Sequence, residues 1–311
     1  MSDGLVINDT TYAGEVASQF LVKAITGADT ISGGHVYVKD GIKKKYTIPR
    51  WDSNFEDFIQ DRQATTISKG AWTADGKVLD PQDFMIYTEF NPRDFEDHWY
   101  AVQLNPKLID RALPATVESV MVQEAMKRYF KYFNKAIWNN DMSLASTSIY
   151  KYWNGFIKNA QLDAGTLAVS SPITLTSSNI EAEFGRGYDM IPEALRYDPN
   201  MKIFVSYKTF GLWETYQRAQ LYKGVDVTRE GSDMFRGKKV VRIADFPNDA
   251  YMIAKGTASP DSNLWVGMNS VDDQGLMLKQ LQANSEKYFI KMLCKADVQI
   301  GWAEETVLYK A

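Results

Sequence analysis

Cysteine and histidine are scarce in this sequence, with one cysteine and two histidines among 311 residues. The single Cys294 excludes a disulfide within the chain and a zinc site built from cysteines. His98 follows Glu96 and Asp97, where a solvated or interface role is favoured over general acid–base catalysis. His35 lies in a predicted hairpin, and no HExxH, GxSxG, CxxC or GxGxxG motif is present. We therefore predict no catalytic residue, no bound cofactor and no metal site.

Net charge and long apolar runs are also limited. The chain has 35 Lys and Arg residues against 39 Asp and Glu residues, which gives a net charge of −4. A dedicated binder of nucleic acid or of anionic membranes carries a strongly basic face, which this balance does not provide. The N-terminus lacks the apolar core of a signal peptide, and no uncharged apolar run reaches the roughly 18 residues of a membrane span. We expect a chain suited to a reducing cytoplasm, with no membrane partner.

The first third of the chain is typical of extended structure with little core of its own. Residues 13–26 carry apolar side chains at helical spacing, which predicts a short amphipathic helix that needs another surface. Within residues 33–51, Asp40 and Gly41 stand between two strand-like runs, and this dipeptide is the typical turn of a β-hairpin. Strand and turn chemistry continues to residue 106 without a long helix.

Residues 114–138 show the clearest helical pattern in the sequence. Pro114 suits the first turn, while Glu118 near the start and basic residues toward the end match the helix dipole. Two apolar stripes, which include Tyr129 and Phe133, predict a long helix with partners on both flanks. We interpret its aromatic residues as core and not as a cofactor site.

The second half of the chain mixes helices and strands. Residues 178–220 predict a helix, a strand and a helix, and short apolar strands follow up to residue 268. Residues 285–309 interleave charged and apolar side chains, which is typical of a long strand or a strand pair. No internal repeat or low-complexity linker is present, so an α+β fold is predicted.

Residues 231–247 raise the question of a nucleotide site, because a glycine, a short spacer and Gly-Lys precede an apolar run. Five residues separate Gly231 from Gly237, where a phosphate-binding loop has four. Lys239 then follows Lys238, where that loop requires a Ser or Thr to reach magnesium. A strand-like run also stands in place of the required helix. We interpret Gly237 as a turn residue and treat a nucleotide-dependent enzyme as the weaker alternative.

The order of these elements resembles that of a tailed-bacteriophage major capsid protein of the Hong Kong 97 type. Residues 113–141 look like its spine helix, and residues 178–220 look like the helix, strand and helix of its axial domain. Residues 234–254 and 263–268 look like axial-domain strands, and residues 288–309 look like the strand that returns to the peripheral domain. The resemblance implies an α+β capsid fold with an N-terminal arm, an extended β-hairpin loop, a peripheral domain and an axial domain.

The resemblance also implies a division of the chain. The predicted parts are an N-terminal arm at 1–32, an extended loop with peripheral-domain strands at 33–106, a peripheral domain at 107–165 with its spine helix at 114–138, an axial domain at 166–284, and a C-terminal strand that returns to the peripheral domain at 285–311. In this family the extended loop reaches over a neighbouring subunit, and residues 33–51 are the candidate segment here.

A capsid protein of this type implies a structural function without enzymatic activity. The chain is then expected to assemble into pentamers and hexamers of an icosahedral phage head that encloses double-stranded DNA without reading its sequence. Because the chain begins with only a short arm, we expect a separate scaffolding protein, together with a portal and decoration proteins. Synthesis in the host bacterial cytoplasm and a location in the virion follow. An encapsulin-type compartment shell of the same fold is the nearest alternative.

Contacts between subunits are the expected sites of such a protein. The run of three lysines after Gly41 is interpreted as an exposed loop and not as a nucleic-acid contact, because the chain is acidic overall. The candidate inter-subunit contacts are Asp40, Gly41, Lys43, Lys44, Lys45, Lys238 and Lys239.

Overall fold

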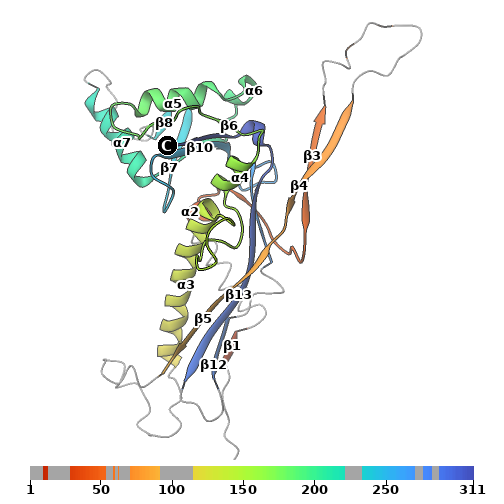
Figure 1. The fold of residues 1–311 in the computed structure, drawn as a ribbon, viewed down its shortest axis with the longest axis vertical. Helices are drawn as coiled ribbons and strands as arrows, with labels where there is room; N and C mark the ends of the chain where they lie inside the picture. The colour runs from red at the N-terminus through yellow and green to blue at the C-terminus, as the bar shows by residue number, and fades with distance from the viewer. Residues whose placement is uncertain are drawn as a thin grey trace, which may run out of the picture.

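Figure 1 shows an elongated molecule in which a long helix and two sheets form the body and a two-stranded ribbon projects from it. The computed structural model describes residues 10–12, 29–53, 59, 62, 71–91, 115–220, 233–269, 276–281 and 287–311. The predicted amphipathic segment 13–26 and His98 lie outside these residues. Short elements of the body include α2 (Asp29–Ser32), α4 (Phe156–Leu162) and a 3-10 helix at Ala303–Glu305.

The first sheet is organised around the long strand β13 (Tyr288–Ile300) and is called the β13 sheet. Its order is β1–β12–β13–β11–β2, and β5 also pairs with β13. The other strands are β1 (Thr10–Tyr12), β2 (Tyr37–Lys39), β5 (Gln82–Phe90), β11 (Leu264–Met268) and β12 (Leu276–Gln280). Buried and more exposed side chains alternate along β13, which confirms the long strand predicted from the interleaved charges.

The long helix α3 (Ala115–Asn139) packs against one face of the β13 sheet. It ends one residue later than the predicted 114–138, and residue 114 lies outside the described residues. Tyr129 and Phe133 are buried, and the ring of Tyr129 lies 6.2 Å from the ring of Phe84 in β5. The interpretation of the aromatic stripe as core is therefore confirmed for the part of the helix whose side chains are described.

The second sheet, called the β10 sheet, has the order β6–β14–β10–β7–β9–β8. Its strands are β6 (Leu167–Ala168), β7 (Met201–Ser206), β8 (Met234–Phe235), β9 (Lys238–Ile243), β10 (Ala250–Lys255) and β14 (Val307–Lys310). Helices α5 (Ile180–Asp189) and α7 (Tyr207–Ala219) cover one face, and α6 (Glu193–Arg196) links α5 to β7. Phe184 and Trp213 meet on that face with ring centroids 5.7 Å apart. The predicted helix, strand and helix is confirmed.

The two sheets share one core at the C-terminal end of α3. Trp138 is fully buried there, and its ring centroid lies 5.3 Å from that of Phe204 in β7 and 5.3 Å from that of Phe156 in α4. The indole N–H of Trp138 donates to Thr30 Oγ1 at 2.8 Å. Met292 of β13 belongs to the same cluster of buried side chains. One core therefore joins α3, both sheets and two short helices.

The structure corrects the hairpin predicted at Asp40 and Gly41. Gly41 has the positive φ of +77° that a turn favours, yet the strands on its two sides pair with other partners. β2 pairs in parallel with β11, whereas β3 (Tyr46–Ser53) pairs with β4 (Trp72–Leu79). Ile42 explains the difference, because its side chain is buried and its N–H donates to a carbonyl of β11, which keeps the chain on the β13 sheet.

The sheets also divide the chain differently from the predicted domains. β11 and β12 belong to the β13 sheet, although the predicted axial domain extends to residue 284. At the chain end, β13 lies in one sheet and β14 pairs with β10 in the other, so the C-terminal strand predicted at 285–311 is wrong beyond β13. Short apolar strands carry no local signal that tells one sheet from the other, because strand propensity reports burial and not partner choice.

Gly155 lies where the loop before α4 passes close to the end of α3. A Cβ at this position would lie 2.6 Å from backbone atoms of Trp138. We expect Gly155→Ala to lower the free energy of unfolding by about 1–3 kcal/mol, because the backbone must shift to admit the methyl group. Gly211 inside α7 has open space around it, so Gly211→Ala is expected to raise that free energy by about 0.5–1 kcal/mol. Urea unfolding measures both changes, and two changes of the same sign would contradict this assignment.

Candidate functional site

The ribbon of β3 and β4 leaves the body of the molecule and points away from both sheets (Figure 1). Its strands pair antiparallel over their full length, from Tyr46 opposite Leu79 to Ser53 opposite Trp72. Residues opposite each other in such a pair share a face, and neighbours along a strand point to opposite faces. The register therefore defines two faces of the ribbon.

One face contacts the body at the base of the ribbon. Ile48 and Leu79 are buried in a small cluster with Ile42 and Trp265. Tyr46, which is opposite Leu79, stacks on the ring of Trp265 at a centroid distance of 6.3 Å. These contacts join the ribbon to β11, the strand that carries Trp265.

Arg50 attaches the same face farther out. Its guanidinium contacts both carboxylate oxygens of Asp75, which is its partner across the ribbon. It also donates to the carbonyl of Gly301 at 2.9 Å and lies 4.6 Å from the ring centroid of Trp302. The hydrogen bond from Arg50 lowers the pKa of Asp75 below its usual value. The side chains therefore fix which face of the ribbon is turned toward the body.

The opposite face of the ribbon is apolar and exposed. It is formed by Thr47, Pro49, Trp51, Trp72, Ala74, Gly76 and Val78, and is called the tryptophan face. Trp51 and Trp72 each expose 68% of their surface, and Val78 exposes 43%. An exposed apolar surface of this kind marks a site of interaction, because burial of such side chains against a partner is favourable.

A second uncovered apolar surface lies on the β13 sheet, on the face opposite α3. Alternation along β5 places Phe84 toward α3 and its neighbours Met85 and Tyr87 on the other side. Leu293 of β13 is opposite Met85 in the register, and both are exposed. This surface is formed by Met85, Tyr87, Met277 and Leu293, and is called the sheet patch.

A carboxylate lies below the surface where the ribbon joins the β13 sheet. Asp297 of β13 accepts the N–H of Asp80 at 2.8 Å, and Asp80 directly follows β4. Burial raises the pKa of Asp297 to about 7, although hydrogen bonds from the N–H groups of Asp80 and Val298 act in the opposite direction. Lys45 pairs with the carboxylate of Asp80 at 3.2 Å. Lys45, a predicted contact between subunits, therefore forms an ion pair within its own chain.

We expect the Asp297 carboxyl to titrate near neutral pH. Because its folded-state pKa is raised, this group favours folding at low pH, and that contribution is lost as the pH rises from 3.8 through about 7. Asp261 is the matched control, since hydrogen bonds from Ser259 and Lys255 lower its pKa to about 2. Carbon-13 NMR of the carboxyl groups gives both midpoints, and a midpoint near 3.8 for Asp297 would refute the expectation.

The other predicted contacts around the first turn lie at the base of the ribbon. Asp40, Gly41, Lys43 and Lys44 are exposed in the segment that connects β2 with β3. The carboxylate of Asp40 accepts the N–H of Gly41 at 2.7 Å. The structure thus brings these residues together beside Lys45, at the end of the ribbon that is away from Trp51 and Trp72.

The structure corrects the prediction that Lys238 contacts another subunit. The β8–β9 hairpin turns at Arg236 and Gly237, whose φ values of 44° and 80° are typical of a type I′ turn. Lys238 follows with a buried side chain, and its ammonium donates to the carbonyl of Asp198 at 2.6 Å. Burial lowers the pKa of Lys238. A strand and not a helix follows the turn, so the described part of 231–247 does not form a phosphate-binding loop.

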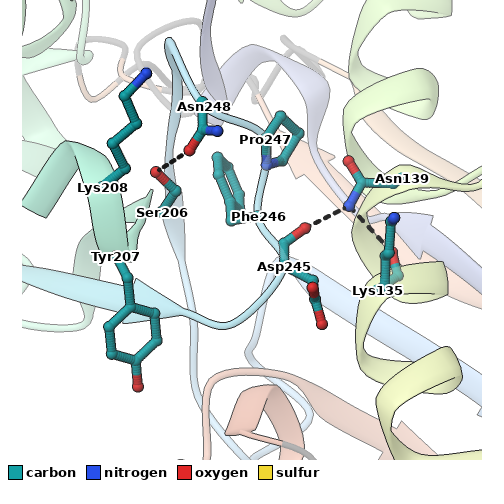
Figure 2. Close-up of a pocket in the computed structure, with 9 residues that line it drawn as sticks. All are labelled: Lys135, Asn139, Ser206, Tyr207, Lys208, Asp245, Phe246, Pro247 and Asn248. Carbon is teal, nitrogen blue, oxygen red and sulfur yellow. Dashed lines mark hydrogen bonds between the residues drawn. The ribbon is translucent and has the colours of Figure 1, made fainter.

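Figure 2 shows a polar pocket of about 420 Å³ between the end of α3 and the start of α7. It is lined by Lys135, Asn139, Ser206, Tyr207, Lys208, Asp245, Phe246, Pro247 and Asn248. The Asn139 amide donates to the carbonyl of Asp245 at 2.8 Å, and the Ser206 hydroxyl donates to Asn248 Oδ1 at 3.1 Å. These bonds attach the loop after β9 to α3 and to the N-cap residue of α7, which gives the four bonded residues a structural role.

Among the residues that the structure describes, no group of His, Cys, Asp and Glu side chains is placed to hold a metal ion. No helix in the described part of the chain is long and apolar enough to cross a membrane.

Sequence reasoning missed the tryptophan face. A signal was present in the sequence. Thr47, Pro49 and Trp51 alternate with Ile48 and Arg50, which is the two-residue period of a strand. Alternation separates two faces but does not say which one meets the core. In the structure, the contacts between the ribbon and the body determine which face meets the core.

Comparisons with known proteins identify the fold. No protein-family model matches the sequence, and no curated protein matches it. The chain is similar to a chain of the satellite phage P4 procapsid, with a TM-score of 0.64 and 13% identity over 97% of this chain and 93% of that chain. It is also similar to the capsid of an empty GTA particle, with a TM-score of 0.61 and 10% identity over 91% and 90% of the two chains.

A virus-like particle from Pyrococcus furiosus also matches, with a TM-score of 0.51 and 12% identity over 96% of this chain and 99% of that chain. The matches extend along nearly the whole chain. They confirm the predicted α+β fold, which is that of tailed-phage major capsid proteins of the Hong Kong 97 type.

Proposed function

We propose that the chain is a structural shell protein that assembles into the pentamers and hexamers of an icosahedral phage head and has no enzymatic activity. The tryptophan face carries this proposal. An isolated two-stranded ribbon is marginally stable in water, so a ribbon with Trp51 and Trp72 at 68% exposure needs a partner surface. The likeness of the fold to phage capsid structures supports the same function.

A second copy of the chain supplies the partner surface in this proposal. The outer part of the ribbon lies away from β12 and the adjoining part of β13 (Figure 1), so the tryptophan face of one copy can pack on the sheet patch of the next. A contact between two different patches of identical subunits closes into a ring when it is repeated by rotation, and pentamers and hexamers are such rings. Obligate contacts of this kind bury about 2,000 Å² or more in total.

The capsid proposal extends to location and to other partners. The protein is made in the host bacterial cytoplasm and resides in the virion, where it acts with a separate scaffolding protein, a portal and decoration proteins. Double-stranded DNA is enclosed without sequence-specific contacts. A net charge of −4 suits this role, because a strongly basic lining would retain the genome through counterion release.

Domain roles and contact residues complete the proposal. The β13 sheet with α3 forms the peripheral domain, and the β10 sheet with α5 and α7 forms the axial domain. The exposed residues that stay as candidate contacts between subunits are Asp40, Gly41, Lys43, Lys44, Lys45 and Lys239.

An encapsulin-type compartment shell is the second candidate function. The likeness to the virus-like particle from Pyrococcus furiosus supports it, although the TM-score of 0.51 is lower than the 0.64 of the phage P4 procapsid match. The alternative of a nucleotide-dependent enzyme is weakened, because the ammonium of Lys238, its main candidate for binding phosphate, donates to the carbonyl of Asp198.

The test is co-expression of the chain with its genomic neighbours, followed by light scattering and electron microscopy of the purified product. The proposal expects closed particles that protect double-stranded DNA from nuclease. Particles that contain protein cargo and no DNA would favour the compartment shell. A chain that stays a monomer under all of these conditions would overturn both shell functions.

A further inference from the structure

Two lysines and a histidine converge on the face of the β10 sheet that is turned toward α3. Lys202 of β7 is the register partner of Lys239 in the parallel strand β9, so both side chains lie on the same face. His35, between α2 and β2, places its Nδ1 at 3.3 Å from Lys202 Nζ. The imidazole packs edge-on against Phe204, with ring centroids 5.8 Å apart. This cluster is called the Lys202 site.

The imidazole does not add a charge to this cluster at neutral pH. Burial, followed by the nearby Lys202 and Lys239, lowers the pKa of His35 to about 4. Neutral His35 can therefore accept a hydrogen bond from the Lys202 ammonium through Nδ1. Burial and the nearby Lys239 also lower the pKa of Lys202. Two ammonium groups thus lie close enough to repel each other, and one of them is half-buried.

The Lys202 ammonium has no carboxylate partner among the residues that the structure describes. Lys239 has one, Asp233, at the long distance of 3.7 Å. A half-buried ammonium without an anion is unfavourable, because it has lost part of its hydration and gained only a neutral acceptor. The structure therefore leaves a charge uncompensated at the Lys202 site.

Lys255 is a lysine of the same sheet whose ammonium has carboxylate partners. Its side chain is 20% exposed, and two carboxylates reach its ammonium, Asp198 at 3.2 Å and Asp261 at 3.1 Å. Although burial acts to lower the pKa of Lys255, the hydrogen bonds to Asp261 and Asp198 raise it above its usual value. Lys202 and Lys255 lie on neighbouring strands and on opposite faces of one sheet, and among the described residues Lys202 lacks the carboxylate partners that Lys255 has.

We propose that Lys202 and Lys239, with His35, bind a carboxylate carried by a second copy of the chain. The inference rests on the proposed shell function, in which copies meet at defined surfaces. An acidic chain offers many carboxylates to its neighbours, as its net charge of −4 indicates. A half-buried ammonium suits one side-chain carboxylate, whereas the phosphates of a duplex require an exposed row of cations. Packing of His35 on Phe204 gives the site a fixed wall.

The first test uses acetate as the carboxylate probe on the unassembled chain. Acetate is titrated at constant ionic strength with chloride as the reference, and the ring signals of His35 are followed by NMR. We expect saturable shifts in the wild type, their loss in Lys202→Met and their retention in Lys310→Met, which removes an exposed lysine from another strand of the sheet. Equal shifts in the wild type and in Lys202→Met would overturn the site, and saturation by phosphate without any response to acetate would overturn the choice of a carboxylate.

The second test compares stability with assembly. Lys202→Met keeps the aliphatic packing and removes the uncompensated charge, so the melting temperature of the unassembled chain is expected to rise. The concentration needed for particle formation is expected to rise about tenfold or more, because the partner carboxylate loses its cation. Lys202→Arg is expected to retain assembly. Loss of a purely structural lysine would instead lower the melting temperature while the concentration needed for particle formation rises.

The two tests separate this inference from the shell function. If the wild type forms no particles, the shell function fails, and the acetate titration still reports on the Lys202 site. If Lys202→Met assembles as the wild type does, the second copy is not the source of the anion and the inference is overturned. Normal assembly with reduced DNA content would assign the site to nucleic-acid phosphate and would overturn it as well.

Discussion

Replacement of both exposed tryptophans, Trp51→Ser with Trp72→Ser, is expected to abolish particle formation and to leave the chain folded. Truncation of a buried aromatic anchor at an interface costs about 2 kcal/mol or more, and each 1.4 kcal/mol is about a tenfold change in affinity. Two such losses raise the concentration needed for assembly about a thousandfold. Light scattering across a concentration series, with electron microscopy of the products, measures the effect.

The fold of this double variant is the control for that result. Each tryptophan exposes 68% of its surface in the isolated chain, so the free energy of unfolding is expected to stay within about 0.5 kcal/mol for each change. Thr73→Ser is the matched variant, because Thr73 is exposed on the other face of the same strand and should assemble normally. Normal assembly of the double variant would show that the tryptophan face is not an interface.

Local patterns were sufficient to predict the elements whose stability is local. The 3.6-residue period of α3 and the alternation of β13 appear in the sequence because each element has one face that must be buried. Gly237 was likewise predicted as a turn residue, and the structure places it with Arg236 in a type I′ turn. These features needed no knowledge of distant partners.

Features that depend on distant partners were not predictable in the same way. Gly41 has the positive φ that its sequence indicates, but Ile42 binds to β11 more than 200 residues later, and this contact cancels the hairpin. Lys238 stands beside a turn and a second lysine, which indicates exposure, yet the carbonyl of Asp198 gives its ammonium a partner inside the chain. Local sequence cannot reveal such a partner, since its position is set by the sheet.

The candidate site also depends on partners that are distant in the sequence, so local patterns did not predict it. The sequence predicted an extended loop but placed it at 33–51, whereas the ribbon consists of 46–53 and 72–79. Pairing partners 25 residues apart, such as Arg50 and Asp75, fix its register, and Gly301 together with Trp302 fixes its orientation. The exposed tryptophans become an interaction surface only once this orientation is known.

Truncation of the fully buried Trp138 to alanine is expected to lower stability strongly. Removal of a buried tryptophan costs about 3–5 kcal/mol, which is a large part of the 5–15 kcal/mol that stabilises a typical domain. The ring of Trp138 meets those of Phe156, Phe204 and Phe246 at 5.0–5.3 Å, and its N–H bond to Thr30 is lost as well. Urea unfolding of the unassembled chain, followed by circular dichroism, measures the loss.

The position of Trp138 also predicts how the chain unfolds. Because its core contains Phe204 of the β10 sheet and Met292 of the β13 sheet, both sheets are expected to unfold in one transition, and the substitution should shift that transition as a whole. Trp138→Phe keeps most of the ring contacts and should cause a smaller shift. Two separate transitions in the wild type, of which the alanine substitution moves only one, would show that the sheets are independent domains. A subunit whose two sheets unfold together is a rigid body, so contacts at the ribbon and at the β10 sheet can act on the same unit during assembly.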